Sequence, residues 1–314
     1  MDALKIIDPG PMTTIQDLGR FGYQRFGLPV CGALDDFSAR MANLLVGNHE
    51  NAALLEITFM GFKAEVLCDC RLALCGAEMP MSLNGESASP WTTHVVKAGN
   101  RLELKPAVKG LRGYLAVSGG IDVPLVMGSR STYAGAKIGG LDGRILKKGD
   151  VLPKGDGESS QEVKSLPQEF RPVYEKSVTL RALPGPQDDF FDQGLEVFFS
   201  SVYKISTKAD RMGYRLEGPK VELKPDVPVS IISEPSLSGA VQVPPDGQPI
   251  ILLIEQTVGG YVKIATVLKP DINLVAQARP GEEIKFAQVD LDSAREAHQE
   301  YLDRLNRIRE LLGG

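Results

Sequence analysis

The stretch 250-IILLIEQTVGGYVKIATVL-268 contains two short apolar runs on either side of a glycine pair. Its two halves have the composition of strands, and Gly259-Gly260 allows a ligand to approach the backbone closely. Strand signals at this density predict a mainly β protein of closed or sandwiched architecture rather than alternating strands and helices. The other strand-like runs cover residues 3–7, 53–59, 94–98, 101–105, 113–119, 178–183, 196–201 and 229–233.

Three segments carry helical signals. Residues 36–46 have an apolar stripe and are followed by Gly47, which favours a helix end there. A short helix is predicted near residues 187–194, with Gly194 as its stop signal. The longest helix is predicted at residues 290–312. It either packs on its own domain or contacts a second protein chain, and both interpretations stay open. Its apolar stripe is Leu291, Ala294, His298, Tyr301, Leu302, Leu305, Ile308 and Leu312.

A polar stretch at residues 154–168 separates two β-rich halves and has the composition of a linker or a long exposed loop. The predicted organisation is an N-terminal β lobe, a linker, a C-terminal β lobe and a C-terminal helix. Their ranges are 1–153, 154–176, 177–289 and 290–314.

The two halves also share short patterns. Each begins with a strand followed by Pro-Gly-Pro, at residues 9–11 and 184–186. In addition, 20-RFGYQRFGLP-29 and 211-RMGYRLEGP-219 both read Arg-x-Gly-Tyr-x-x-x-Gly before a proline. This register predicts a duplicated β domain, with a recurrent turn motif of no common origin as the alternative.

Composition excludes some functions. The 314 residues are 43% hydrophobic with a net charge of -5, which makes a nucleic-acid binder a poor candidate. The N-terminus lacks the basic and apolar regions of a signal peptide, and no apolar run approaches the roughly 20 residues that span a bilayer. We therefore expect a cytoplasmic protein.

The four cysteines are Cys31, Cys68, Cys70 and Cys75. Their spacing does not match a standard zinc site, so buried free thiols are the preferred interpretation and a zinc site is the alternative. No catalytic signature of a serine hydrolase, zinc protease or P-loop protein is present. The glycine-rich residues 128–143 are interpreted as an anion-holding loop, a lid or a plain flexible loop.

Polar residues in β-turn contexts form the candidate site. Arginines bind carboxylate or phosphate oxygens in a bidentate manner, and a buried Asp17 would accept a proton or hold Arg20 in place. Together they predict a site for a small polar or anionic molecule, with Arg20 and Arg211 facing a cleft shared by the two lobes. The candidates are Gln16, Asp17, Arg20, Asp35, Ser118, Gly119 and Gly120 in the first half, and Arg211, Tyr214, Glu234, Gln242, Gln256, Thr257 and Lys263 in the second.

Longer motifs resemble the KipA-like family, also called allophanate hydrolase subunit 2-like or biotin-dependent carboxyltransferase-like proteins. They extend from about Ile6 to Phe286. The runs that carry the resemblance are 8-DPGPMTTIQDLGRFGYQRFGLPVCGALDD-36, 115-LAVSGGIDVPLVMGSRSTY-133, 183-LPGPQDDFF-191, 210-DRMGYRLEGP-219, 239-GAVQVPPDGQPIILL-253 and 256-QTVGGYVKIATVL-268.

This resemblance implies two tandem cyclophilin-like β-barrel lobes. It also implies the C subunit of an ATP-dependent 5-oxoprolinase, which opens 5-oxo-L-proline to L-glutamate together with a KipI-like B subunit and a LamB/YcsF-like A subunit. ATP is then expected at a site shared with one of these partners. Two alternatives stay open: a biotin-dependent carboxyltransferase acting on urea or another small amide, and a regulatory partner of a KipI-like kinase inhibitor.

The resemblance assigns roles where residues match. Catalytic roles fall on Asp17, Arg20, Asp35 and Arg211. Substrate-binding roles fall on Gln16, Ser118, Gly119, Gly120, Tyr214, Gln242, Gln256, Thr257 and Lys263, and no metal ligand is predicted. The chain departs from the family pattern at Cys31, where relatives have serine, and at Ile254, Glu255 and Val258. The last three departures put the identity of the substrate in question.

Overall fold

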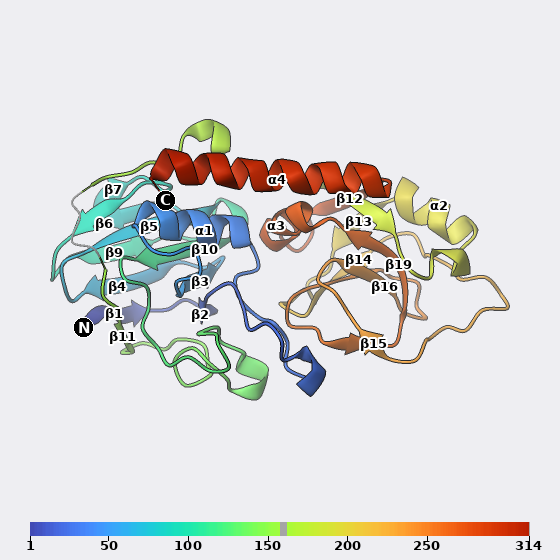
Figure 1. Cartoon of the computed structure of the whole chain (residues 1–314), viewed down its shortest axis with the longest axis horizontal. Coiled ribbons are helices and arrows are strands. Elements are labelled where there is room, and N and C mark those ends of the chain that lie inside the picture. Colours follow the sequence, from blue (N-terminus) through green and yellow to red (C-terminus); the bar gives the residue numbers. More distant parts are fainter. Residues whose placement is uncertain (158–161, 314) are drawn as a thin grey trace. The chain divides into compact units, whose positions relative to one another are not determined.

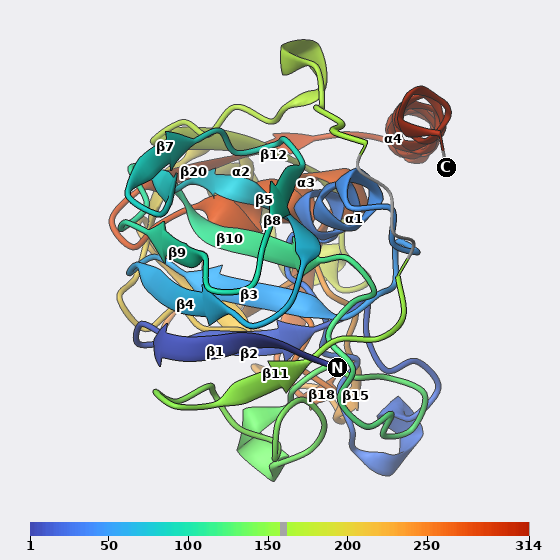
Figure 2. The ribbon, with the colours of Figure 1, turned by 90° about the vertical axis from the view of Figure 1, so that its left-hand side faces the viewer.

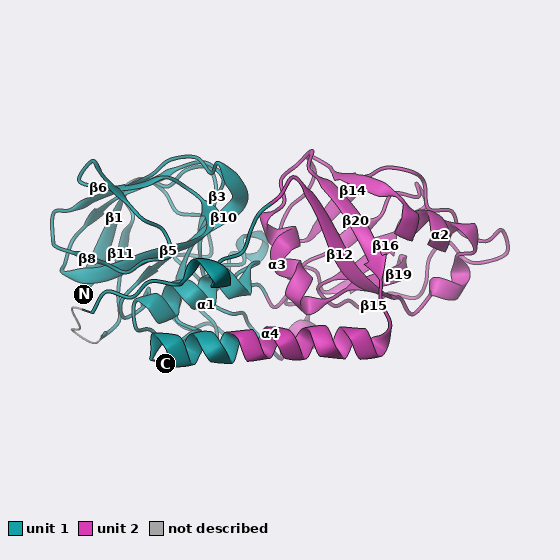
Figure 3. Cartoon of the chain, turned by 90° about the horizontal axis from the view of Figure 1, so that it is seen from above, with its two compact units in different colours: residues 1–21, 31–174, 305–314 teal, residues 22–30, 175–304 magenta. Residues whose placement is uncertain are grey.

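The structure is a computed structural model that describes residues 1–157 and 162–313. The chain divides into two compact units (Figure 3). Unit 1 comprises Met1–Phe21, Cys31–Tyr174 and Leu305–Gly314, and unit 2 comprises Gly22–Val30 and Glu175–Arg304. The boundary after Tyr174 falls inside the predicted linker, of which residues 158–161 lie outside the described residues.

Unit 1 is built from two antiparallel sheets. The six-stranded sheet has the order β11-β1-β4-β9-β6-β7, and the five-stranded sheet has the order β2-β3-β10-β5-β8. The strands of the first are β11 (Val151–Pro153), β1 (Asp2–Asp8), β4 (Phe62–Val66), β9 (Arg101–Leu104), β6 (Met81–Leu83) and β7 (Glu86–Ala88). Those of the second are β2 (Thr13–Gln16), β3 (Leu54–Thr58), β10 (Lys109–Val117), β5 (Cys70–Glu78) and β8 (His94–Val96).

The core of unit 1 lies between these two sheets. Leu4 and Ile6 of β1 and Leu72 and Leu74 of β5 are fully or almost fully buried in one apolar cluster. Strand β5 is buried on both faces, because the alternate residues such as Cys75 are covered as well. A second layer must therefore cover the outer face of this sheet.

That layer is helix α1 (Asp36–Leu45), which packs against β5 and β10 (Figure 2). Asp35 caps its N-terminus, since its carboxylate accepts hydrogen bonds from the Ser38 amide at 3.0 Å and the Ser38 hydroxyl at 2.6 Å. The predicted helix at residues 36–46 is therefore confirmed.

Unit 2 is a closed barrel with the strand order β12-β19-β16-β17-β14-β13-β20. Six of its seven neighbouring pairs are antiparallel, and β12 runs parallel to β20. Its strands are β12 (Ser177–Pro184), β19 (Val262–Val267), β16 (Ala240–Val243), β17 (Ile250–Leu252), β14 (Gly213–Glu217), β13 (Val202–Ile205) and β20 (Glu283–Gln288). A separate two-stranded sheet joins β15 (Glu234–Pro235) to β18 (Val258–Gly259).

The mainly β prediction is thus confirmed, and the closed barrel belongs to unit 2. Unit 1 differs from a second such barrel, because its strands form two separate sheets. The shared Pro-Gly-Pro runs do follow the first strand of each unit, β1 and β12. The Arg-x-Gly-Tyr runs, however, form a 3-10 turn (Gln24–Phe26) in one case and strand β14 in the other. Those shared letters do not mark equivalent elements.

Helix α2 (Gln193–Ser200) corrects two predictions. The segment around residues 187–194 forms only a 3-10 turn at Asp188–Phe190, and Gly194 lies inside the first turn of α2 rather than ending a helix. Of residues 196–201, predicted as a strand, residues 196–200 continue that helix. Gly194 and Phe198 are buried four residues apart, and a Cβ on Gly194 would lie 2.2 Å from the Glu222 carbonyl oxygen. Gly194 therefore serves close packing.

Two further differences lie in unit 2. Residues 229–233 form no strand, and Ile232 is 93% exposed, so apolar composition alone was misleading there. Helix α3 (Lys269–Gln277) was not predicted, although Pro270 and Asp271 in its first turn are helix-start signals. Its Asp271 carboxylate accepts a 2.6 Å hydrogen bond from Arg181 Nη2 of β12.

Helix α4 (Leu291–Leu312), the long red helix of Figure 1, confirms the C-terminal prediction. Its buried stripe is narrower than predicted and consists of Ala294, Ala297, Leu305, Ile308 and Leu312. Leu291, His298 and Leu302 are exposed instead. In unit 1, Arg309 of α4 donates to the Glu50 carboxylate, which also pairs with Arg40 of α1 at 2.5 Å.

The described part of the predicted linker packs within unit 1. Leu166 is fully buried and its amide donates to the Trp91 carbonyl at 2.9 Å. The remaining short helices are 3-10 turns at Ala134–Ala136 and Gln168–Phe170. Cys31, Cys70 and Cys75 are buried thiols outside any disulfide, and Cys68 is half-buried. No helix within residues 1–157 and 162–313 is both long and apolar enough to cross a membrane.

Candidate functional site on the barrel of unit 2

The barrel cavity is a hollow of about 340 Å³ on unit 2. Strands β14, β16 and β17 provide one side, and residues 256–261 provide the other. The lining residues are Lys208, Asp210, Met212, Gly213, Arg215, Gln242, Ile250, Leu252, Gln256, Val258, Gly259, Gly260 and Tyr261. Of the predicted site residues, this cavity brings together Gln242 and Gln256 with the predicted glycine pair.

Strand register explains which side chains face the cavity. Tyr214, Ile251 and Val241 lie opposite one another on three adjacent strands, and all three are buried. The neighbouring row contains Arg215, Ile250 and Gln242, which are also directly paired across the same strands. Because successive residues of a strand point to opposite faces, this second row lies on the outer face of the barrel.

Gln242 has an unusual environment in this row. Its side chain is only 3% exposed, and its Nε2 has no hydrogen-bond partner among the described residues. Gly259 lies directly against it, since a Cβ at that position would be 2.3 Å from Nε2. A buried amide donor without a partner costs on the order of 1–3 kcal/mol of folding free energy. A ligand that accepts a hydrogen bond from Nε2 would recover part of this free energy.

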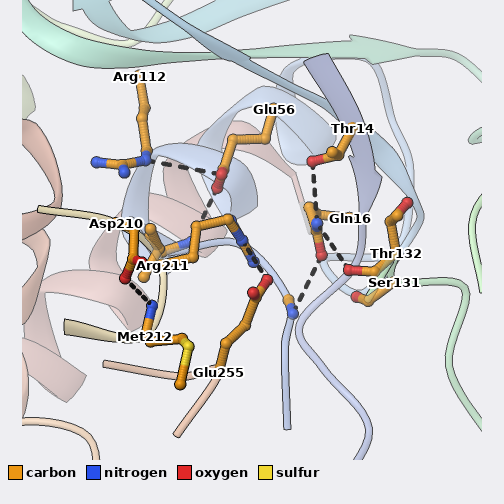
Figure 4. Close-up of polar contacts among 12 residues, drawn as sticks. Thr14, Gln16, Glu56, Arg112, Ser131, Thr132, Asp210, Arg211, Met212 and Glu255 are labelled. Atoms are coloured by element: carbon orange, nitrogen blue, oxygen red, sulfur yellow. Dashed lines mark hydrogen bonds and ion pairs between the residues drawn. The ribbon is translucent and has the colours of Figure 1, made fainter. Parts of the chain in front are cut away.

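The other second-half candidates are engaged within unit 2. Arg211 is 7% exposed and donates through Nε to the Glu255 carboxylate (Figure 4). Glu255 is one of the departures from the family pattern, and it supplies the counter-charge for Arg211. The adjacent Asp210 accepts hydrogen bonds from the amides of Met212 at 2.8 Å and Gly213 at 3.1 Å.

Lys263 is held in a similar way. Its ammonium group lies 2.6 Å from the Glu234 carboxylate, and this hydrogen bond lowers the pKa of Glu234. The Thr257 carbonyl accepts from the Ser236 amide at 3.0 Å, and Tyr214 is buried on the opposite face of β14 from the cavity. None of these three side chains lines the barrel cavity.

The first-half candidates hold one loop of unit 1. Arg20 is 1% exposed and donates to the carbonyls of Val126 and Ser131, each at 2.9 Å. Asp17 accepts from the Ser129 hydroxyl at 2.7 Å, from the Arg130 amide at 2.6 Å, and from the Ser131 hydroxyl. These contacts fasten residues 126–131, and they account for both side chains without a ligand.

Gln16 and the Ser118 turn also have internal partners. Gln16 donates to Thr14 at 3.0 Å and to the Thr132 carbonyl at 3.2 Å, and it accepts from the Gly32 amide at 3.1 Å (Figure 4). The Ser118 hydroxyl accepts from the Arg71 amide at 3.0 Å.

The glycines of that turn serve close packing. A Cβ on Gly119 would lie 2.2 Å from the Gly155 carbonyl oxygen, and one on Gly120 would lie 3.1 Å from the Ala52 side chain. The close approach that Gly119 permits is therefore used by the chain itself. The predicted cleft shared by Arg20 and Arg211, which belong to different units, stays a prediction.

Sequence reasoning missed two groups. Lys208 and Arg215 line the barrel cavity, and only knowledge of the strand register brings Arg215 beside Gln242. In unit 1, buried Glu56 accepts hydrogen bonds from the Tyr114 hydroxyl at 2.9 Å and the Leu34 amide at 3.0 Å. Burial and the charge of Glu56 raise the pKa of Tyr114 well above its ordinary value.

Comparisons with known proteins cover nearly the whole chain. The family model for the carboxyltransferase domain, subdomain A and B, matches residues 26–288. The C subunit of 5-oxoprolinase from Escherichia coli is 44% identical, with 95% of this chain and 94% of that protein aligned. Its counterpart from Haemophilus influenzae is 38% identical over 97% of this chain and 98% of that protein. Urea amidolyase of Saccharomyces cerevisiae is 33% identical over 93% of this chain but only 17% of that protein.

Two solved structures also match the chain over more than nine-tenths of its length, and both belong to longer chains. The urea amidolyase of K. lactis superposes with a TM-score of 0.86 and 32% identity over 93% of this chain, which spans 19% of that protein. The structure of TTHA0988 gives a TM-score of 0.83 and 38% identity over 91% of this chain. This chain spans 55% of the TTHA0988 chain, about half of its length.

Proposed function

This chain belongs to the carboxyltransferase-domain family of subdomains A and B, and on that premise we propose that it is the C subunit of an ATP-dependent 5-oxoprolinase. The single observation that carries the proposal is the end-to-end similarity to the 5-oxoprolinase C subunit, which spans 94% of the Escherichia coli protein. The urea amidolyases contain a related segment within much longer chains.

The proposed reaction opens the lactam ring of 5-oxo-L-proline to L-glutamate. A lactam is a stable amide, and phosphorylation of its carbonyl oxygen makes the carbonyl carbon a better electrophile. The contribution of this chain is to bind the lactam and orient it. The barrel cavity suits that task, since it combines a buried donor at Gln242 with an apolar surface at Ile250 and Leu252.

The two arginines predicted to stabilise phosphate charge are engaged within the chain. The guanidinium of Arg211 pairs with Glu255, and that of Arg20 donates to main-chain carbonyls. Among the described residues, no three His, Cys, Asp or Glu side chains are grouped to hold a cation. We therefore derive no step of the reaction through ATP on this chain alone, and we assign its binding to a site shared with a partner protein.

The proposed partners are two proteins, a KipI-like B subunit with a LamB/YcsF-like A subunit. The test is a reconstitution of all three purified proteins with 5-oxo-L-proline and ATP, followed by release of glutamate and phosphate. We expect ATP-coupled glutamate release that requires this chain. Equal glutamate release from the two partners alone would contradict the proposal.

Carboxyl transfer to a small amide is the second candidate, favoured by the family model and by the urea amidolyase structure. The chain contains no Met-Lys-Met biotinylation segment, so this reaction would need a separate biotin carrier. Supplying carboxybiotin with urea or another small amide distinguishes the two functions. A carboxylated product formed without glutamate release would favour this candidate over the first.

A further inference from the structure

The barrel cavity has two cationic residues that the chain leaves without counter-charges. Lys208 and Arg215 line it, and within the part of the chain that the structure describes neither side chain has a hydrogen-bond or ion-pair partner. The carboxylate that lines the same cavity, Asp210, accepts from the amides of Met212 and Gly213. The two cations are therefore available to an anionic group of a ligand.

Gln242 adds a second requirement on the ligand, which is a hydrogen-bond acceptor. Gln242 lines the cavity, it is buried, and its Nε2 has no partner among the described residues, which makes it the candidate hydrogen-bond donor of the cavity wall. A neutral acceptor such as an amide carbonyl satisfies this donor, whereas an apolar ligand leaves the penalty in place. The ligand that suits this cavity therefore has a carbonyl near Gln242 and an anionic group near Lys208 and Arg215.

Strand geometry sets the distance between these two requirements. Gln242 and Arg215 are each paired directly with Ile250, so they lie on adjacent strands on either side of it. Strands are about 4.8 Å apart, which puts the two backbones about 10 Å apart, and both side chains stand on the same outer face of the barrel. A ligand with its carbonyl and anion only a few ångström apart is the size that fits. The cavity of about 340 Å³ lies at the small end of ligand pockets.

We propose that the barrel cavity binds a small carboxylate-bearing amide, with Gln242 Nε2 donating to the carbonyl and Arg215 and Lys208 pairing with the carboxylate. The apolar surface of Ile250 and Leu252 contacts the ring carbons. This inference rests on the proposed function and extends it, because 5-oxo-L-proline carries both groups on one ring. Urea has the carbonyl without the carboxylate, so Arg215 and Lys208 select against it.

Binding to the isolated full chain tests this assignment separately from turnover. Titration calorimetry compares 5-oxo-L-proline with 2-pyrrolidinone, which is the same lactam ring without the carboxylate. We expect Arg215→Gln to weaken 5-oxo-L-proline about tenfold or more and to leave 2-pyrrolidinone unchanged, since a charge-assisted pair is lost only with the former. Gln242→Leu should weaken both ligands by a similar factor, because both contain the carbonyl.

Lys204→Gln is the matched control, since it removes one exposed positive charge from neighbouring strand β13 outside the cavity. It should change neither affinity, and circular dichroism should show that all variants fold. No binding of 5-oxo-L-proline to the wild-type chain, or an equal effect of Arg215→Gln on both ligands, would overturn the assignment. Binding with this pattern but no glutamate release by the reconstituted complex would instead refute only the proposed function.

Discussion

At the scale of single residues, the buried polar candidates of unit 1 make hydrogen bonds to other groups of the same unit. Asp17 was predicted to accept a proton or to hold Arg20 in place, and Arg20 to bind an anion, yet their polar atoms are used by residues 126–131. Gln16 similarly joins β2 to the Thr132 and Gly32 backbones. Their predicted catalytic and binding roles remain open to experiment, and stability measurements separate the two kinds of role.

Asp17→Asn is expected to destabilise the chain by about 2–4 kcal/mol, because the amide cannot accept all the hydrogen bonds that converge on the carboxylate. Urea unfolding at neutral pH measures this change. Asp156→Asn is the control, since Asp156 is exposed. A loss of turnover in the complex with unchanged unfolding would show instead that Asp17 acts in catalysis.

Gly119→Ala is expected to cost about 3 kcal/mol or more. The φ of +91° already disfavours alanine, and the added Cβ would meet the Gly155 carbonyl oxygen at 2.2 Å. Gly99→Ala separates these causes, because Gly99 has a φ of +87° but no atom near the new Cβ, so it should cost only about 1 kcal/mol. Equal thermal shifts for the two variants would mean that the close approach to Gly155 is unimportant.

At the scale of elements, the C-terminal end of α4 makes a polar contact within unit 1 at the Glu50 carboxylate. Burial alone would raise the pKa of Glu50, but hydrogen bonds from Arg309 and Arg40 outweigh it and hold that pKa below 4.5. Leu305, Ile308 and Leu312 bury the apolar side of the same helix end. The network therefore adds polar stability to a contact that is already apolar.

Glu50→Gln should reduce the free energy of unfolding by about 1 kcal/mol at pH 7. Because the folded-state pKa lies below the ordinary 4.5, the wild-type advantage is present above pH 4.5 and disappears as the pH falls through the folded-state value. Chemical denaturation of both proteins between pH 7 and pH 3 checks this. A difference that stays constant across that range would contradict the predicted linkage.

At the scale of the whole molecule, ligand binding and folding are coupled. A ligand that binds the folded chain stabilises it by about 2.7 kcal/mol when its concentration is 100 times Kd. We expect 5-oxo-L-proline to raise the melting temperature of the wild-type chain and to have a much smaller effect on Arg215→Gln at the same concentration. An equal shift for Lys204→Gln and wild type confirms that the lost charge matters only in the cavity. Equal shifts for Arg215→Gln and wild type would argue against this cavity.

Local patterns predicted much of the fold because they depend on neighbours in sequence. The apolar run of residues 262–268 and the apolar stripe of residues 36–46 with its following Gly47 are visible without any tertiary information. The failures occurred where packing overrides composition. Residues 196–201 have the apolar density of a strand, but Gly194 and Phe198 bury one face of a helix. Residues 229–233 are apolar yet largely exposed, which composition cannot reveal.

The sequence by itself determined the family, the mainly β class, the long C-terminal helix and several polar residues worth testing, since these follow from motifs and short-range periodicity. Tertiary structure decided which polar residues are already satisfied and which are not. Asp17 and Gln242 were both candidate ligand contacts in the sequence. In the structure the Asp17 carboxylate accepts several hydrogen bonds, whereas the buried Gln242 Nε2 has no partner among the described residues. The physical reason is strand pairing: it brings Arg215, Ile250 and Gln242 into one row although they are far apart along the chain.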